Sequence, residues 1–360
     1  MKLLYITNGI NGSGGLERVL SVKTSMLVEQ YDYQLAIIVL NKAHQNLFYQ
    51  FSEKISFYSI PVSGNPVSYF LSYKSGIQKT VNEFQPDIIS VCDDGLKGFF
   101  LPHIIKTSAK WIYERHVSKQ IESNEKDNLI KKLITKVKWH LMEILAQKFE
   151  NFVLLTEGNK DEWKKLNNIK IIPNPLSFAS NEKSNLENKT VICVGKISYQ
   201  KGQDILLKAW EKVYQKFPDW QLHLYGKENL EFLDTQNLEN NVSFFPPEKN
   251  IRQKYIESSV YVMSSRFEGF GMVLTEAMEC GVPCVSFDCP SGPADIIKDG
   301  EDGFLVEKEN TEELAEKLIT LIENQDLRKQ MGIRAKENVK RFSAEKIVQE
   351  WDKLFKELSQ

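Results

Sequence analysis

Short runs of apolar residues alternate with segments of helical periodicity along most of the chain. The apolar runs have the length of buried strands, and the segments between them place apolar side chains at every third or fourth residue. This alternation predicts a mostly parallel β-sheet that is covered by helices on both faces. In the first half, the predicted strands are residues 2–7, 34–40, 55–60, 87–92, 110–113, 152–156 and 169–172, and the predicted helices include 16–28, 69–84 and 129–149.

The alternation pauses at Ile172-Pro173-Asn174-Pro175, which a polar stretch at residues 180–189 follows. Because proline disfavours helix at the residue before it, we interpret this segment as an extended linker and as the domain boundary. Beyond the linker the pattern restarts, with predicted strands at 190–194, 221–225, 242–245, 260–263 and 283–287 and predicted helices at 204–217, 251–258 and 273–280.

Two doubly wound, Rossmann-like domains of nearly equal size follow from this pattern, at residues 1–172 and 173–342, with one large sheet as the alternative. Parallel sheets bind ligands at the carboxyl ends of their strands, so two such domains facing each other would form a cleft between them. Helical patterns end the chain at 311–324, 327–339 and 343–358. The last of them is amphipathic, and we expect residues 343–360 to cross back to the N-terminal domain.

Composition predicts where the protein is located and excludes one class of partner. Hydrophobic residues make up 42% and charged residues 26% of the 360 residues, which is typical of a soluble globular protein. The net charge of −2 gives no general attraction for nucleic acid, so we expect no such partner. The five cysteines lie mostly in apolar stretches and are interpreted as reduced thiols. The first apolar run is too short for a signal peptide, and no run approaches the roughly 18 residues of a membrane span. We therefore expect a cytoplasmic protein.

The strongest chemical signal is the segment from Ser265 to Ala277. A predicted strand ends, a loop with two glycines turns, and a helix begins near Gly271. Backbone N–H groups at a helix start are unpaired and carry the positive end of the helix dipole, which favours a bound phosphate. Glu268 lies in the loop, and Glu276 follows eight residues later in the helix. From there the carboxylate of Glu276 could contact the two hydroxyls of a ribose. The alternative is that Glu268 is a solvated loop charge and that Glu276 complements the helix dipole.

This segment resembles the Glu-x7-Glu motif of the retaining GT-B glycosyltransferases of family 4. Further matches to that family cover the second half almost continuously, and two looser matches lie in the first half. The matches in the second half are Asn174-Pro175, Gly195-Lys196, Gln200-Lys201-Gly202, Leu206-Leu207 with Ala209, and Cys289-Pro290-Ser291-Gly292-Pro293. The looser matches in the first half are Gly14-Gly15-Leu16-Glu17-Arg18 and Glu114-Arg115-His116.

The resemblance implies roles for the charged residues of the second half. Lys196 and Lys201 would clamp the diphosphate of a nucleotide-sugar and stabilise the charge of the leaving group. The family more often has arginine at the position of Lys196, so the bidentate fork of a guanidinium is lost there. Glu268 would contact the transferred sugar, and Glu276 would bind the ribose. The alternative for both lysines is a solvated surface position.

The resemblance also implies roles for the remaining site residues, which would contact the donor through their backbone or line the donor sugar. The backbone of Phe270, Gly271, Met272 and Val273 would hold phosphate and sugar hydroxyls. The Gly14-Gly15 loop would close over the diphosphate, although glycine-rich turns after a first strand are common. His116 would line the donor sugar, although a single histidine at a strand end is more often structural.

We expect neither a metal nor a cofactor. Asp93-Asp94 lacks the Asp-x-Asp spacing of a metal-diphosphate clamp, and Asp299-Gly300-Glu301 is interpreted as a glycine-rich turn. Lysines and helix N-termini would supply the positive charge instead.

Residues 126–148 combine lysines with apolar residues at helical spacing. Such a helix is typical of contact with an anionic membrane, where a lipid-linked acceptor would be found. The alternative is an ordinary helix that packs on the sheet.

The predicted function is the transfer of a hexose or N-acetylhexosamine, with retention, from a nucleotide-diphosphate sugar to a hydroxyl of a glycan or polyprenyl-linked glycan. UDP-sugars are favoured because they are the commonest donors of the family, and a role in surface polysaccharide or glycoconjugate biosynthesis follows by analogy. Transfer on one face and a covalent intermediate both remain open. The alternatives are a nucleotide-sugar epimerase, a phosphorylase and a non-catalytic nucleotide-sugar-binding protein. A Rossmann oxidoreductase would need a G-x-G-x-x-G fingerprint, which the chain lacks.

Overall fold

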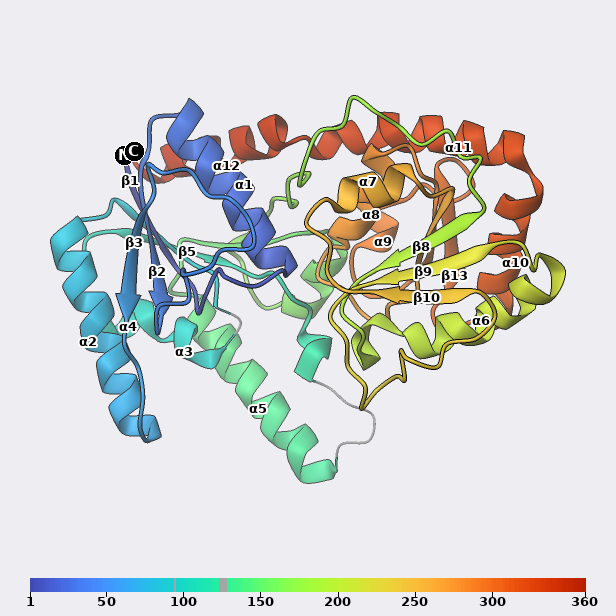
Figure 1. The fold of residues 1–360 in the computed structure, drawn as a ribbon. Coiled ribbons are helices and arrows are strands. Elements are labelled where there is room, and N and C mark those ends of the chain that lie inside the picture. Colours follow the sequence, from blue (N-terminus) through green and yellow to red (C-terminus); the bar gives the residue numbers. More distant parts are fainter. Residues whose placement is uncertain (94, 123–127) are drawn as a thin grey trace. The chain divides into compact units, whose positions relative to one another are not determined.

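The computed structural model describes residues 1–93, 95–122 and 128–360. The chain separates into two compact units: an N-terminal unit of Met1–Pro175 with Ala344–Gln360, and a C-terminal unit of Leu176–Ser343. Each unit is built on its own parallel sheet, as Figure 1 shows. The predicted pair of parallel-sheet α/β domains is thereby confirmed.

The N-terminal unit has a seven-stranded sheet in the order β3-β2-β1-β4-β5-β6-β7, and all neighbouring strands run parallel. The strands are β1 (Lys2–Ile6), β2 (Gln34–Leu40), β3 (Ser56–Ile60), β4 (Ile88–Val91), β5 (Lys110–Glu114), β6 (Asn151–Leu154) and β7 (Ile169–Ile171). The chain order reverses between β1 and β4. In open parallel sheets, such a switch point is where a ligand binds beyond the carboxyl ends of the strands.

Helices cover both faces of this sheet, because successive residues of a strand point to opposite faces. In β1, Leu4 and Ile6 belong to the core beneath α2 (Pro66–Phe84), α3 (Leu96–Phe99), α4 (Leu101–Ile104) and α5 (Leu129–Ala146). Leu3 and Tyr5 belong to the opposite core, beneath α1 (Gly15–Gln30) and α12 (Ala344–Leu358). Both faces are therefore buried, which explains why the strands appear as continuous apolar runs.

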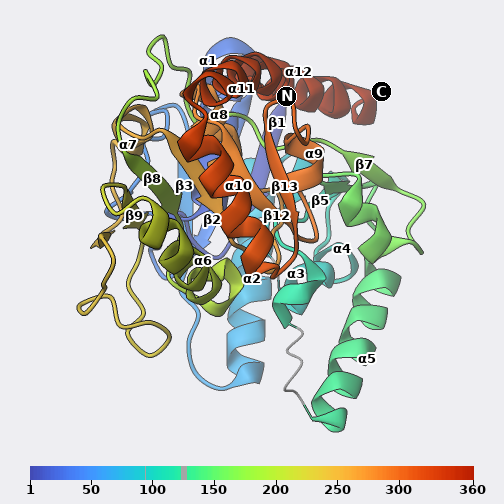
Figure 2. The ribbon, with the colours of Figure 1, turned by 90° about the vertical axis from the view of Figure 1, so that its right-hand side faces the viewer.

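The last helix of the chain, α12, completes the N-terminal unit. It packs beside α1, as Figures 1 and 2 show, and its buried residues include Ile347, Trp351 and Phe355. The hydroxyl of Tyr33 donates a hydrogen bond of 2.8 Å to Oδ1 of Asp352, which is itself buried. The apolar stripe of α12 thus forms part of one of the two apolar cores of the N-terminal unit.

The C-terminal unit has a six-stranded parallel sheet in the order β10-β9-β8-β11-β12-β13. The strands are β8 (Thr190–Val194), β9 (Gln221–Tyr225), β10 (Val242–Phe245), β11 (Val260–Met263), β12 (Cys284–Asp288) and β13 (Gly303–Glu307). The helices are α6 (Gln203–Lys216), α7 (Ile251–Ile256), α8 (Met272–Glu279), α9 (Pro293–Ile296), α10 (Thr311–Glu323) and α11 (Gln325–Asn338). The helices α6 and α10 share one apolar core with the sheet. The switch point of this unit lies between β8 and β11.

The sequence pattern did not predict β13. Its residues follow the turn that was expected around Asp299-Gly300-Glu301, where Gly300 has a φ of +73° and its N–H donates to the carbonyl of Gly303 at 2.9 Å. From Cys284 to Asp288, each residue of β12 pairs in register with a residue of β13. A short apolar run directly after a turn was too weak a signal for a strand.

Among the described residues, no helix has the length and the apolar character that crossing a membrane requires.

Candidate active site

The predicted donor residues of the second half gather at the switch point of the C-terminal unit. The loop after β8 carries Lys196 and leads through a short 3₁₀ turn (Tyr199–Lys201) into α6. The loop after β11 carries Glu268 and leads into α8. Because β8 and β11 are adjacent and parallel, these loops meet at the carboxyl edge of the sheet.

Lys201 and Glu268 are in direct contact. The Nζ of Lys201 lies 2.6 Å from Oε1 of Glu268, and the hydroxyl of Ser265 donates to the same oxygen at 2.6 Å. The side chains of Lys201 and Glu268 are 21% and 7% exposed, so the pair is partly shielded from water. A charge-assisted hydrogen bond in this setting fixes the carboxylate in one orientation.

Lys196 is placed differently from Lys201. It follows Gly195 at the end of β8 and is exposed, and its Nζ has no hydrogen bond or ion pair with any residue that the structure describes. Both predicted lysines thus lie on the same edge of the sheet, but only Lys201 touches Glu268.

The start of α8 offers unpaired backbone N–H groups. Its N-cap is Gly271 with a φ of +98°, and no side chain caps it. Met272 and Val273 form the first turn and are half-buried, whereas Phe270 is buried against the ring of Phe342. Uncapped N–H groups and the positive end of the helix dipole are the ingredients of an anion site.

Glu276 is held inside the C-terminal unit. Its Oε1 accepts a hydrogen bond of 2.7 Å from the hydroxyl of Ser177, and its Oε2 accepts one of 3.1 Å from the hydroxyl of Tyr255. The residue is only 1% exposed. Its role as the ribose ligand stays a prediction.

Arg266 joins the two loops, and no role was predicted for it. Its guanidinium forms a bidentate pair with Asp204 at 2.9 and 2.8 Å, and its Nε lies 2.6 Å from Oε1 of Glu309. It also donates to the carbonyl of Tyr199 and stacks over the ring of that residue. Burial opposes the charge of Arg266, but the hydrogen bonds with Asp204 and Glu309 outweigh burial and raise its pKa. The available signal was an arginine inside the motif segment, whereas its contact with Asp204 at the start of α6 is visible only in the structure.

A third loop, after β12, supports the loop of Glu268 from the other side. The N–H of Glu268 donates to the carbonyl of Pro290 at 2.9 Å, and the N–H of Ser291 donates back to the carbonyl of Glu268 at 3.1 Å. Gly292 follows with a φ of +116°, and a Cβ at this residue would lie only 1.9 Å from the carbonyl oxygen of Phe270. The backbone approach at Gly292 therefore leaves no room for a side chain.

We expect Gly292→Ala to destabilise the C-terminal unit and to lower donor affinity, because the methyl group must push the Phe270 carbonyl away. The loss of unfolding free energy should exceed the roughly 1–3 kcal/mol of a strained backbone conformation. Gly300→Ala is the matched control, since Gly300 also has a positive φ but a Cβ there meets no atom within 4 Å. Thermal unfolding of both variants checks this, and equal midpoints would contradict the steric argument.

His116 lies in the N-terminal unit, directly after β5. Its Nε2 is 3.2 Å from Oε2 of Glu114, which also forms an ion pair with Lys23 and accepts a hydrogen bond of 2.6 Å at Oε1 from the hydroxyl of Ser90. Although burial opposes ionisation, Lys23 and His116 lower the pKa of Glu114 to about 2. The carboxylate can only accept, so Nε2 of His116 carries the proton.

The second ring nitrogen of His116 is available for a ligand. Its Nδ1 is buried and has no hydrogen-bond partner among the residues that the structure describes. In the neutral imidazole with its proton on Nε2, Nδ1 is an acceptor, which suits a sugar hydroxyl. The contact of His116 with a donor sugar stays a prediction.

Lys23 is a further residue that the sequence did not reveal. It is fully buried on α1, and its Nζ lies 4.9 Å from the ring centre of Tyr5 and 4.0 Å from that of Trp351 in α12. Trp351 thereby covers the ion pair of Lys23 with Glu114. A lysine among the apolar positions of a helix was the only signal.

The Gly14-Gly15 loop begins α1 as predicted. Gly14 is the N-cap and no side chain caps the helix. The carboxylate of Glu17 lies beside the loop, because a Cβ on Gly14 would be 2.7 Å from one of its oxygens. Burial raises the pKa of Glu17. A protein carboxylate thus already lies against this loop, and a diphosphate there would meet it.

One group of side chains has the spacing of metal ligands. Atoms of Cys92, Glu114 and His116 all lie within 4.8 Å of one another. The ammonium of Lys23 pairs with the same oxygen of Glu114, however, and would repel a divalent cation. This arrangement does not favour a metal. Asp94, one half of the Asp93-Asp94 pair, lies outside the described residues.

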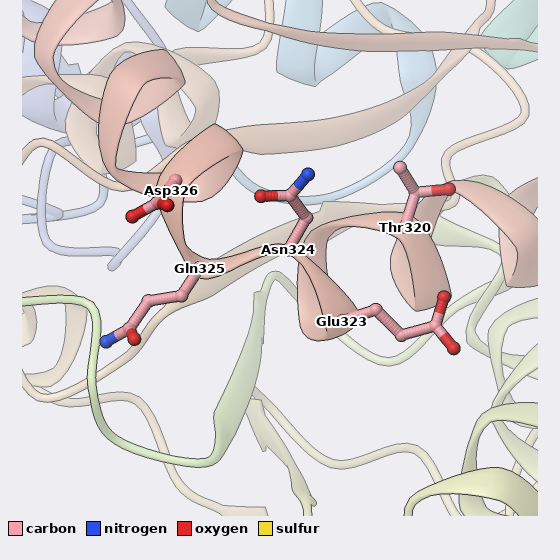
Figure 3. Close-up of a pocket in the computed structure, with 5 residues that line it drawn as sticks. All are labelled: Thr320, Glu323, Asn324, Gln325 and Asp326. Carbon is pink, nitrogen blue, oxygen red and sulfur yellow. The ribbon is translucent and has the colours of Figure 1, made fainter.

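A pocket of about 590 Å³ opens between the end of α10 and the start of α11, as Figure 3 shows. Its lining residues are Thr320, Glu323, Asn324, Gln325 and Asp326. Asn324 caps α11 by accepting from the N–H of Leu327 at 2.9 Å. The lining includes none of the predicted site residues and offers carboxylates rather than cations, so it does not suit a diphosphate.

The sequence and the fold of this chain are similar to those of known proteins. The family model of glycosyl transferases group 1 matches residues 177–338. An uncharacterized glycosyltransferase of Haemophilus influenzae is 32% identical, with 97% of this chain and 98% of that relative covered. The amylovoran biosynthesis glycosyltransferase AmsD of Erwinia amylovora is 28% identical over 98% of both chains. The structure of a mutant of S. aureus TarM, in complex with fondaparinux, alpha-GlcNAc-glycerol and UDP, is 16% identical and matches 99% of this chain and 100% of that one with a TM-score of 0.78.

Proposed function

Because the chain belongs to the group 1 glycosyl transferases and has the GT-B fold, we propose that it transfers a sugar from a nucleotide-diphosphate sugar to an acceptor hydroxyl with retention of the anomeric configuration. The observation that carries this proposal is the contact of Lys201 with Glu268 at the switch point of the C-terminal unit. A cation beside a carboxylate that can accept sugar hydroxyls suits a donor whose diphosphate leaves.

The charges of the C-terminal unit support a diphosphate there. Lys201 and the exposed Lys196 would face the phosphates, and the uncapped start of α8 would donate its backbone N–H groups. Glu268 would bind hydroxyls of the transferred sugar, and Glu276 would bind the ribose. We propose UDP as the nucleotide, a choice supported by the UDP in the complex of TarM. The sugar is a hexose or an N-acetylhexosamine.

The reaction would need no metal, because these lysines and N–H groups supply the positive charge that the leaving diphosphate requires. His116 would contact the reacting sugar through Nδ1, held in place by Glu114. The acceptor hydroxyl would then attack the anomeric carbon as the carbon–oxygen bond to the diphosphate breaks, and its proton would pass to the leaving diphosphate.

The acceptor that we propose is a hydroxyl of a glycan or of a polyprenyl-linked glycan, in surface polysaccharide or glycoconjugate biosynthesis. The similarity to AmsD, an amylovoran biosynthesis enzyme, supports this class. A polyprenyl-linked acceptor is embedded in the membrane, so we also propose a cytoplasmic protein that works at the inner face of the cell membrane.

The test is nucleotide release from a panel of UDP-, GDP- and ADP-sugars in the presence of EDTA. We expect slow release from one UDP-sugar at a rate that EDTA does not change, and its loss in Glu268→Ala. Glu312→Gln, at a glutamate 70% exposed on α10, is the control and should release nucleotide like the native protein.

The rival functions give different results in the same experiment. A nucleotide-sugar-binding protein would bind a donor and release nothing, even with crude lipid-linked acceptor supplied. An epimerase would produce a new nucleotide-sugar in place of free nucleotide. Release that stops with EDTA and returns with a divalent cation would overturn the metal-free mechanism.

A further inference from the structure

Helix α5 of the N-terminal unit exposes an unusual amount of apolar surface. Six of its large aliphatic side chains are between 52% and 85% exposed. They are Leu129, Ile130, Leu133, Ile134, Val137 and Ile144. Figures 1 and 2 show that α5 runs outward from its unit, so that its first turns lie furthest from the sheet. A contiguous apolar patch of this kind on a folded protein marks a surface that contacts another body.

These six side chains lie on one stripe of the helix. At about 100° per residue, they fall within an arc of roughly 150°. Met142 and Ala146 lie on the other side of the helix and are buried in the core of the unit. The helix is therefore attached to its unit by the last turns of one face, while the opposite face is open to solvent. The prediction of an ordinary packed helix holds only for these last turns.

Lysines border the stripe on both sides. Lys131 and Lys138 fall beyond one edge of the arc, and Lys132 and Lys136 fall beyond the other. No aspartate or glutamate occurs from residue 128 to residue 142, whereas Glu122, Glu125 and Asp127 precede this stretch. Lys126, which belongs to the same basic segment, lies outside the described residues. An apolar stripe between two basic borders matches an anionic lipid surface, with acyl chains below and phosphates on either side.

We propose that the first turns of α5 lie in the interface of an anionic phospholipid membrane, with the aliphatic stripe toward the acyl chains and the lysine borders at the lipid phosphates. A second copy of this chain is a poorer occupant. A two-fold contact between identical stripes would bring the same lysine borders against each other. The proposal rests on α5 alone, and it names the surface through which the protein would contact the membrane that the proposed function requires.

The experiment is co-sedimentation of the full chain with sucrose-loaded vesicles in the absence of any donor. We expect binding to vesicles of phosphatidylcholine with phosphatidylglycerol, little binding to phosphatidylcholine alone, and weaker binding as salt is added. The paired substitution Leu133→Gln with Ile134→Gln should lower the binding constant about tenfold or more. Lys132→Gln with Lys136→Gln should lower it for anionic vesicles and reduce the salt dependence.

Two matched controls use exposed residues elsewhere. Ile333→Gln replaces an isoleucine that is 61% exposed on α11, and Lys79→Gln replaces a lysine whose side chain is 77% exposed on α2. Both should bind vesicles like the native chain. All the residues changed are exposed, so circular dichroism and the thermal midpoint should stay at the native values.

The proposal is overturned if the native chain ignores anionic vesicles, or if the Leu133 and Ile134 substitutions leave binding unchanged. It is also overturned if gel filtration shows a dimer that these substitutions dissociate, because the stripe would then be an interface between copies. Nucleotide release from the donor panel is measured separately. A chain that releases nucleotide but does not bind vesicles contradicts the membrane surface and leaves the proposed reaction intact.

Discussion

Lys201→Ala is expected to lower kcat for sugar transfer by about 100- to 1,000-fold, the usual effect of removing one group that stabilises developing charge. The Nζ of Lys201 lies 2.6 Å from Oε1 of Glu268, and the proposed reaction releases a nucleoside diphosphate whose developing charge this ammonium would stabilise. Among the described residues, the substitution leaves Ser265 as the remaining donor to Oε1 of Glu268. Steady-state kinetics with the donor identified by nucleotide release would measure the effect.

Lys196→Ala is the matched comparison, because it tests whether Lys201 rather than Lys196 stabilises the leaving group. Lys196 lies on the same sheet edge but is exposed and touches no carboxylate that the structure describes, so we expect a rise in KM and a loss in kcat of about tenfold or less. Lys201→Arg keeps the charge and should retain more activity than alanine. If Lys196→Ala lowers kcat more than Lys201→Ala, then the leaving group is stabilised at Lys196 and the assignment of roles is wrong.

A double-mutant cycle of Lys201→Ala and Glu268→Gln tests whether the two residues act as a unit. Residues in direct contact couple strongly, so the double variant should lose little more than Lys201→Ala alone. Additive losses would mean that the contact in the free protein has no part in catalysis.

The local parts of the fold and of the site were predictable from the sequence. Buried parallel strands form continuous apolar runs, so nearly every strand was predicted to within one or two residues. The loops at the second switch point were predictable too, since Lys201 and Glu268 each follow a strand at the same sheet edge. Their contact was not predicted, because it depends on β8 and β11 being neighbours in the sheet, and the alternation of strands and helices does not give the strand order.

The features that escaped prediction depend on residues far apart in the chain. Glu276 is buried, and its carboxylate accepts a hydrogen bond from Ser177, 99 positions away. Lys23 and Glu114, 91 positions apart, form a buried pair. None of these three charged residues differs in its local sequence from a solvated charge on a helix or at a strand end. What determines their state is tertiary packing, and Trp351 comes from the last helix of the chain.

Lys23→Met is expected to lower the free energy of unfolding by about 3–5 kcal/mol at pH 7, because it leaves the carboxylate of Glu114 buried without its cation. Lys353→Met is the control. Lys353 is 77% exposed on α12, 4.0 Å from Glu357, and a surface pair of this kind contributes at most about 1 kcal/mol. Urea unfolding of both variants against the native chain gives the comparison.

Acid should reduce the difference between Lys23→Met and the native chain. The pKa of Glu114 is lowered to about 2 in the folded protein from an ordinary value of 4.5. A carboxyl with a lowered folded pKa contributes stability above its unfolded pKa, and this contribution is lost as the pH falls from about 4.5 through about 2. In the variant Lys23 no longer favours ionisation and only the contact with His116 remains, so the carboxyl protonates at a higher pH than in the native chain and its burial becomes less costly. The difference in unfolding free energy should therefore be smaller at pH 3 than at pH 7.

The double variant Lys23→Met with Glu114→Gln tests why Lys23→Met loses stability. It distinguishes the cost of an unpaired buried carboxylate from the loss of packing around Lys23. The glutamine amide carries no charge, and its carbonyl can still accept from Ser90, whose hydroxyl lies 2.6 Å from Oε1 of Glu114. We expect the double variant to recover part of the stability that Lys23→Met loses, because no unpaired charge remains in the core. If both are equally destabilised at pH 7 and at pH 3, then Lys23 acts through its contact with Trp351 and Tyr5 rather than through its charge.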